Sequence, residues 1–207
     1  MESKKAQRIG IMGGTFDPIH IGHLIIAEEV RERFALEYVL FIPARIPPHK
    51  QRSAKEAIHR YNMVKLAIAG NPCFCISDIE MKRPGPSFTI DTLKELRCQY
   101  GSNAELYFIA GTDTIRDLPN WNHHEELLGL CEFIGATRPD GSDDIDDIIA
   151  YFGDLGQRIH RLRVPKLEIS STELRKRLRE GRNVRYLLPD AVLQYIKIHG
   201  VYKNERK

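Results

Sequence analysis

The chain has 207 residues, of which 42% are hydrophobic, and a formal net charge of +3. This is enough for one sizeable core, so we expect a single domain over residues 1–207, with its core at 8–165 and a helical C-terminal part at 166–203. The chain lacks an apolar run of about 18 residues, and residues 1–8 lack an apolar signal core. These features predict a cytoplasmic protein without membrane contact.

Six short apolar runs alternate with helical patterns along the chain. The runs lie near residues 8–12, 38–43, 73–79, 105–110, 132–137 and 158–164. Between them, apolar residues recur at helical spacing, as in Ile90, Leu93 and Leu96. This alternation predicts an α/β fold with a doubly wound, Rossmann-like parallel sheet, helices on both faces, and a helical C-terminal part.

The first apolar run leads into the sequence GGTFDPIHIGH at residues 13–23. Apolar residues at helical spacing follow it, so the motif bridges a first strand and a first helix. Gly13 and Gly14 allow backbone N–H groups to approach a ligand closely or to take positive φ angles. Because the N–H groups at a helix start attract anions, this turn predicts a phosphate site.

The motif also contains two histidines, His20 and His23, three residues apart. On a helix they would lie on one face, about 4.5 Å apart along the axis. Gly22 between them leaves room for a flat group. Two imidazoles directed at one spot suit the phosphates and base of a nucleotide, whereas the alternative is a helix start with two surface histidines.

A second helix start is predicted at Ile169-Ser170-Ser171-Thr172, with Arg175 one turn further on. A Ser or Thr can cap this helix, and its N–H groups then point outward. Hydroxyl groups together with a guanidinium, which keeps its charge and presents a fixed fork of donors, suit a triphosphate. An ordinary capped helix is the alternative.

Each polar cluster of interest follows directly after one of the apolar runs. In doubly wound sheets, ligands bind beyond the carboxyl ends of the strands. We therefore expect these clusters to meet at one rim of the sheet. They are residues 13–23, 43–50, 85–92, 111–113, 138–139 and 168–172.

Charge is unevenly distributed along the chain. Residues 158–185 contain ten basic and three acidic residues, which indicates a nucleic acid, a polyphosphate ligand or a solvated helix face. Residues 140–154 contain six aspartates, which we interpret as capping of a helix start rather than as a ligand site. The cysteines, Cys73, Cys75, Cys98 and Cys131, lack the paired spacing of a zinc site, so we expect reduced thiols.

The two helix-start motifs resemble the two signatures of the nucleotidyltransferase superfamily, which shares the element His-x-Gly-His with class I aminoacyl-tRNA synthetases. The resemblance implies ATP binding, with His20, His23 and Arg175 acting in catalysis. Arg175 and the amides of Ser170–Thr172 would hold the β- and γ-phosphates, while Asp113 would contact a ribose. The implied ATP-binding residues are Gly13, Gly14, Thr15, Phe16, His20, Gly22, His23, Gly111, Asp113, Ile169, Ser170, Ser171, Thr172 and Arg175.

Further motifs extend the resemblance to the bacterial nicotinate mononucleotide adenylyltransferases, from about Ile9 to Tyr202. They are Pro47-Pro48-His49-Lys50, Gly85–Thr92, Gly111–Asp113 with Trp121, and Leu188–Ile196. The resemblance implies that Thr89 receives the nicotinate carboxylate, that Trp121 stacks on its ring, and that Lys50 neutralises the incoming phosphate. The implied substrate-binding residues are Asp17, His49, Lys50, Phe88, Thr89, Trp121 and Arg138.

The expected substrates are thus ATP and nicotinate mononucleotide, with Mg²⁺ held mainly by the ATP phosphates and water. Asp17 is the one candidate protein ligand, but a carboxylate in this turn can instead hydrogen-bond the loop, so we expect no protein residue to hold the metal. Three positions depart from the family pattern: Phe88 replaces a Tyr, Thr112 a smaller residue, and Asp117 an aromatic found in some members. The preference for the acid over the amide substrate therefore stays open. So does the formation of a homo-oligomer.

Alternatives remain within and outside this reaction class. A nicotinamide mononucleotide or pantetheine-phosphate adenylyltransferase, or a cytidylyltransferase, would share both terminal motifs, but the last two leave residues 47–50, 85–92 and Trp121 unexplained. A synthetase fragment would need a Lys-Met-Ser-Lys-Ser element, which the sequence lacks. A nucleic-acid-binding protein using residues 175–185 would leave the rim clusters without a role, so we expect no nucleic-acid partner.

Overall fold

The computed structural model describes residues 6–48, 54–137, 145–165 and 167–202, and within these ranges six parallel strands form one sheet. The strand order is β3-β2-β1-β4-β5-β6, with every neighbouring pair parallel. The predicted doubly wound fold is confirmed. The strands are β1 (Arg8–Gly14), β2 (Tyr38–Pro43), β3 (Phe74–Ile76), β4 (Glu105–Gly111), β5 (Glu132–Thr137) and β6 (Ile159–Arg163).

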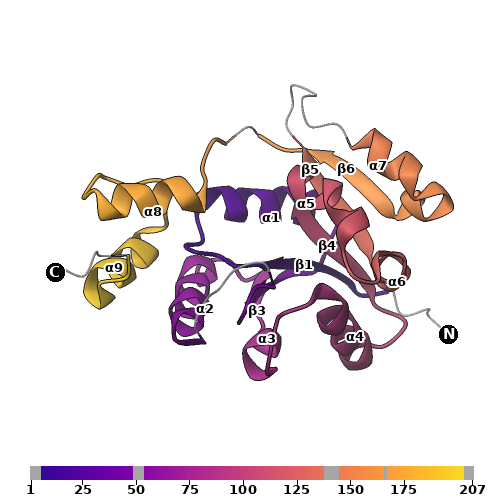
Figure 1. Cartoon of the computed structure of the whole chain (residues 1–207), viewed down its shortest axis with the longest axis horizontal. Helices are drawn as coiled ribbons and strands as arrows, with labels where there is room; N and C mark the ends of the chain where they lie inside the picture. The colour runs from indigo at the N-terminus through magenta and orange to yellow at the C-terminus, as the bar shows by residue number, and fades with distance from the viewer. Residues whose placement is uncertain (1–5, 49–53, 138–144, 166, 203–207) are drawn as a thin grey trace.

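Helices connect the strands and cover the sheet from both sides, with α1 above and α3 and α4 below it in Figure 1. Among the described residues, none of these helices combines the length and the apolar character needed to cross a bilayer. The helices are α1 (Ile21–Arg33), α2 (Ala54–Ile68), α3 (Ile79–Lys82), α4 (Thr89–Tyr100), α5 (Thr112–Arg116), α6 (His124–Leu130), α7 (Asp146–Tyr151), α8 (Ser171–Arg179) and α9 (Asp190–His199), with 3₁₀ turns at Leu118–Asn120 and Gly153–Arg158.

Strand residues alternate between two apolar clusters, one on each face of the sheet. Ile9 and Ile11 of β1 point into the cluster formed with α3, α4 and α6. Met12 of the same strand points into the cluster formed with α1, α2, α8 and α9. Because successive side chains in a strand point to opposite faces, strands buried on both faces are apolar at nearly every position, as β2 is. The edge strand β6 is partly exposed and carries His160, Arg161 and Arg163.

Gly10 of β1 lets the segment that joins α1 to β2 pack closely against the sheet. A Cβ atom on Gly10 would lie 2.9 Å from Leu36 Cδ1 and 3.1 Å from Val39 Cγ2. A side chain there would push outward the segment that joins α1 to β2. The small residue therefore helps to set the position of α1, and with it the position of the loop between β1 and α1.

Two local predictions need correction. The third apolar run was expected to cover residues 73–79, but β3 ends at Ile76 and Ile79 already begins α3. The acidic segment does not cap α7 through a side chain, since the N-cap residue is Ile145; Asp146 and Asp147 lie in the first turn, where their charges favour the helix dipole. Residues 140–144 lie outside the described residues. All four cysteines are free, as expected.

Candidate functional site

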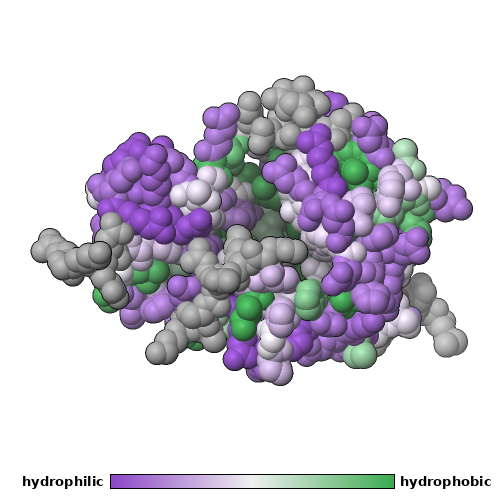
Figure 2. All heavy atoms as spheres, viewed as in Figure 1, coloured by the Kyte–Doolittle hydropathy of each residue, from purple (hydrophilic) through white to green (hydrophobic). Residues whose placement is uncertain are grey.

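The candidate site lies at the carboxyl edge of the sheet, where the strand order reverses between β1 and β4. Two adjoining cavities open there, of about 580 and about 400 Å³. They share Pro48, Ser87, Thr89, Thr114 and Trp121 in their walls, so they form one cleft. Figure 2 shows this hollow in the middle of the face, with apolar residues deep inside and hydrophilic residues beside it. A crevice at this switch point is where doubly wound sheets bind ligands.

The smaller cavity brings together residues from the ends of several strands. Its lining includes Gly13 and Gly14 at the end of β1, Thr15 and Phe16 after it, and Gly111 at the end of β4. His23 of α1 also reaches it. Six of the residues expected to bind ATP therefore line one cavity.

Phe16 supports the loop that follows β1. Its backbone lies in the left-handed region with φ of 48°, which is rare for a side chain of this size. Its buried ring packs 5.2 Å from the ring of His23 and 6.0 Å from that of Phe41, measured between centroids. Packing on both sides holds the loop in this unusual conformation.

The two histidines form a stacked pair, with ring centroids 3.7 Å apart and planes inclined by 33°. The expectation that both lie within a helix is wrong for His20, which is the extended N-cap residue of α1, while His23 is the third residue of the helix. A Cβ atom on Gly22 would lie 3.1 Å from His20 Nδ1. The glycine thus accommodates the ring of His20, rather than only a ligand.

Burial keeps both imidazoles neutral. Desolvation lowers the pKa of His20 to about 4, and desolvation together with the neighbouring His20 lowers the pKa of His23 to about 3. The backbone N–H of His20 donates to His23 Nδ1 at 3.2 Å. Since Nδ1 accepts this bond, a neutral His23 carries its proton on Nε2, which can donate to a ligand.

The start of α8 is docked onto the loop between β1 and α1. Ser170 caps the helix by accepting from the Glu173 N–H at 3.2 Å, as predicted. The Ser171 hydroxyl donates to the Pro18 carbonyl at 2.9 Å, and Arg175 Nη1 donates to the Asp17 carbonyl at 2.7 Å. Two segments about 150 residues apart in the sequence are therefore joined at one end of the cleft.

Asp17 lies beneath this junction and is 6% exposed. Its Oδ1 accepts from the Tyr202 hydroxyl at 2.6 Å, and its Oδ2 lies 3.7 Å from Arg175 Nη1. These contacts fit a carboxylate that fixes the loop better than one that holds a metal. Among the described residues, His, Cys, Asp and Glu side chains form no group of three that could hold a metal ion.

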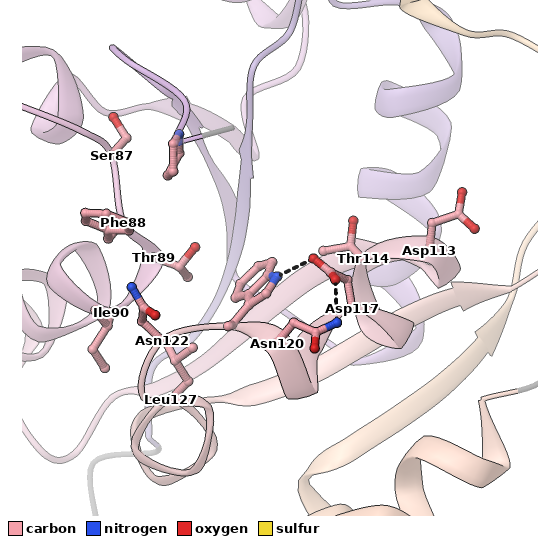
Figure 3. Close-up of a pocket in the computed structure, with 12 residues that line it drawn as sticks. Ser87, Phe88, Thr89, Ile90, Asp113, Thr114, Asp117, Asn120, Asn122 and Leu127 are labelled. Atoms are coloured by element: carbon pink, nitrogen blue, oxygen red, sulfur yellow. Dashed lines mark hydrogen bonds between the residues drawn. The ribbon is translucent and has the colours of Figure 1, made fainter. Parts of the chain in front are cut away.

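The larger cavity is lined by three of the residues expected at a pyridine nucleotide, Phe88, Thr89 and Trp121, whereas Asp17 does not line it. Phe88 is the N-cap residue of α4 and Thr89 its first residue. Figure 3 shows Phe88 and Thr89 on one side of the pocket, with Asp113 and Asp117 on the other.

Trp121 lies between the two cavities, half-buried, and lines both of them. Its ring meets that of Phe108 edge to face at 6.1 Å. Its Nε1 donates to Asp117 Oδ2 at 3.2 Å. Asp117, which departs from the family pattern, therefore orients the indole of Trp121.

Some predicted residues stand apart from the cavities. His20 is buried behind His23. Residues 169–172 and Arg175 do not line either cavity; of these, Ser171 and Arg175 bond to the loop after β1. His49, Lys50 and Arg138 lie outside the described residues, so their roles remain predictions.

Sequence reasoning missed a buried polar cluster in the wall of the smaller cavity. Thr92 Oγ1 donates to Glu80 Oε1 at 2.7 Å, and Arg83 Nη2 lies 2.6 Å from the same hydroxyl. Ser87 Oγ accepts from the backbone N–H of Arg45 at 3.1 Å. Burial raises the pKa of Glu80. The four-residue helix that carries Glu80 has too short a pattern to indicate this role.

The neutral histidine pair predicts a loss of stability in acid. The folded pKa values lie below the ordinary 6.5, so the unfolded chain binds more protons as the pH falls from about 6.5 toward 4. The free energy of unfolding should fall over this window by up to about 1.4 kcal/mol per pH unit for each histidine.

Urea unfolding at a series of pH values would measure this slope. The double variant His20→Asn with His23→Asn should show a shallower slope than the wild type between about pH 6.5 and pH 4. Equal slopes for the two proteins would contradict the neutral pair.

Comparisons with known proteins agree with this geometry. The family model "Cytidylyltransferase-like" matches residues 11–177. A protein of Thermoanaerobacter sp. (strain X514), named "Probable nicotinate-nucleotide adenylyltransferase", is 45% identical over 206 residues, covering 97% of this chain and 96% of that protein. A protein of the same name from Desulfitobacterium hafniense (strain Y51) is 46% identical over 200 residues, covering 95% of this chain and 96% of that protein.

A solved structure shares the same fold. It is the nicotinic acid mononucleotide adenylyltransferase of Plasmodium falciparum complexed with NaAD, with a TM-score of 0.78 and 25% identity. The superposition covers 95% of this chain and 97% of that one. The matched relatives and the cleft at the strand reversal lead to one conclusion: the chain belongs to the nicotinate-nucleotide adenylyltransferases, within the cytidylyltransferase-like nucleotidyltransferases.

Proposed function

We propose that this enzyme transfers the AMP part of ATP to nicotinate mononucleotide, giving nicotinate adenine dinucleotide and pyrophosphate. The observation that carries the proposal is the single cleft, which has the histidine pair and the start of α8 at one end and Trp121 with the start of α4 at the other. A cleft of this form offers neighbouring places for a triphosphate and for a second, aromatic substrate.

At the donor end, His23 donates from Nε2 to an oxygen of the α-phosphate. The negative charge of a bound triphosphate raises the pKa of a neighbouring imidazole, so phosphate binding favours protonation of the pair. The imidazoles then stabilise the charge that accumulates on the phosphate in the transition state. His20 supports His23 from behind through its ring and its backbone N–H.

The β- and γ-phosphates lie at the start of α8 in this proposal. The N–H groups of the first turn and the helix dipole favour an anion there. Two nitrogens of Arg175 already donate hydrogen bonds, Nη1 to the Asp17 carbonyl and Nη2 to the Thr172 hydroxyl. Its guanidinium has five N–H groups, so donors remain for a phosphate oxygen.

At the acceptor end, the nicotinate carboxylate lies at the start of α4, where Thr89 is the first helical residue. The pyridine ring stacks on Trp121, and Asp113 at the rim of the larger cavity contacts a ribose. Lys50 would neutralise the phosphate of the acceptor, and His49 and Arg138 would also bind the acceptor; all three lie outside the described residues.

The chemistry requires no protein nucleophile. An oxygen of the acceptor's 5′-phosphate forms a bond to the α-phosphorus of ATP, while the bond from that phosphorus to the bridging oxygen of the β-phosphate breaks. Pyrophosphate leaves with the electron pair of that bond. The protein therefore acts by positioning and by charge stabilisation. Mg²⁺ enters with ATP as the substrate complex, where it neutralises phosphate charge and keeps several of its waters.

Pyrophosphate release tests the reaction directly. With ATP and Mg²⁺, nicotinate mononucleotide should give the highest kcat/KM, because its carboxylate meets a helix start that an uncharged amide cannot use as well. Nicotinamide mononucleotide, phosphopantetheine, and CTP as the donor serve as comparisons. Chelation of the metal should abolish turnover, and added Mg²⁺ should restore it. A higher rate with phosphopantetheine or with CTP would refute the proposal.

His23→Ala should lower kcat by about 10²-fold, the effect of losing one transition-state donor. His160→Asn is the matched control, since His160 pairs with Glu132 on β5 and β6 and does not line the cleft. Both variants should show a cooperative thermal unfolding transition, which shows that they are folded. A His23→Ala enzyme that turns over at the wild-type rate would remove this residue from the mechanism.

Trp121→Ala should raise the KM for nicotinate mononucleotide by about fivefold, since aromatic stacking contributes about 1 kcal/mol beyond burial. The KM for ATP should change by less than about twofold. Trp121→Phe keeps a stacking ring but loses the bond to Asp117, so it should recover most of the affinity. If Asp117→Asn alone reproduced the alanine effect, the indole N–H rather than stacking would explain the binding.

A further inference from the structure

Arg60 of α2 is the largest fully buried side chain among the described residues, with 1% exposure. Its guanidinium is directed at backbone carbonyls rather than into solvent. Nη1 donates to the Thr15 carbonyl at 2.8 Å and to the Ala44 carbonyl at 2.5 Å. Nη2 donates to the Arg45 carbonyl at 3.0 Å.

These carbonyls belong to two different loops of the site. Thr15 lies in the loop after β1, which lines the smaller cavity next to His23. Ala44 and Arg45 begin the loop after β2, which continues to Pro47 and Pro48 in the cavity walls. The Ala44 N–H also donates to the Gly14 carbonyl at 2.9 Å. Arg60 therefore adds a side-chain bridge beside one backbone bond between the two loops.

The geometry of the guanidinium suits this bridge. It is a rigid, flat fork that keeps its charge, so it can reach several carbonyls at fixed angles, whereas the lysine ammonium is a compact charge on a flexible stem. The buried carboxylate of Glu80, which lies in the wall of the same cavity, is within electrostatic range of Arg60 and balances part of its charge.

We propose that Arg60 is a positioning residue that sets the spacing between the loop that holds ATP and the loop that holds the acceptor. The inference rests on the proposed function, because it assigns one substrate to each loop. In-line attack requires the acceptor oxygen and the α-phosphorus to be aligned closely, and a misplacement of about 1 Å can cost 10²-fold in rate. Arg60 touches neither substrate and acts through Thr15, Ala44 and Arg45.

The test compares Arg60→Lys and Arg60→Met with Arg97→Lys. Arg97 of α4 is a matched control, because it also donates to backbone carbonyls, at 2.8 Å to Leu130 and at 2.5 Å to Ala104. Those carbonyls precede β5 and β4, at the edge of the sheet opposite the cleft. Each protein is assayed well below its own Tm, so that unfolding does not enter the rates.

Arg60→Lys should lower kcat by at least about tenfold, while the Kd for each substrate alone changes by less than about threefold. The two Kd values are measured separately, with ATP by calorimetry and with nicotinate mononucleotide by the fluorescence of Trp121, the only tryptophan. Each loop can still bind its own substrate, so the affinities are kept. The fall in kcat then reflects poorer alignment of the two bound substrates. Arg60→Met should lower kcat further than Arg60→Lys does. Arg97→Lys should keep kcat within about twofold of the wild-type value.

Three results would overturn the inference: a folded Arg60→Lys enzyme with wild-type kcat, equal losses in kcat and in both affinities, or the same loss in Arg97→Lys. Failure of both Arg60 variants to fold while Arg97→Lys folds would also overturn it, since Arg60 would then be a folding residue. A wild-type protein without adenylyl transfer would instead refute the proposed function.

Discussion

The cleft depends on the division of the sheet at β1, which pairs with β2 on one side and with β4 on the other. The chain continues from β1 toward β2 and β3, but from β4 toward β5 and β6. The loops that leave β1 and β4 therefore diverge and cannot cover the space between them. That space becomes the smaller cavity, whose walls combine strand ends, such as Gly13 and Gly111, with residues of the loops that follow them, such as Thr15 and Pro47.

A second feature of the site is that the ionisable groups around the histidine pair are either neutral or already have partners. The imidazoles are neutral in the free protein, Asp17 already meets Tyr202 and Arg175, and Arg60 is used between the loops. The free protein therefore does not bear the desolvation cost of isolated buried charges before the nucleotide binds. Its polarity lies in oriented N–H donors, whose direction is set by packing and does not change when the ligand binds.

Much of the fold and part of the site follow from local sequence patterns. The apolar runs predicted the central strands because a strand buried on both faces must be largely apolar, and the Ser170 cap follows from hydroxyl chemistry. The roles of Arg60, Glu80 and Tyr202 could not be predicted, since their partners lie 12 to 185 residues away and no local pattern specifies those contacts. His20 was misplaced by one helical position because a histidine carries no capping signal.

The contacts of Asp17 also have a consequence for how the protein is made. The loop after β1 leaves the ribosome well before its partners, since the Asp17 carboxylate binds Tyr202 and the carbonyls of the loop bind Ser171 and Arg175. During synthesis the loop therefore lacks these hydrogen bonds until nearly all of the described chain has emerged. A nascent chain therefore acquires its sheet before it acquires an ordered nucleotide pocket, and a truncated product that retains the strands would still lack the assembled site.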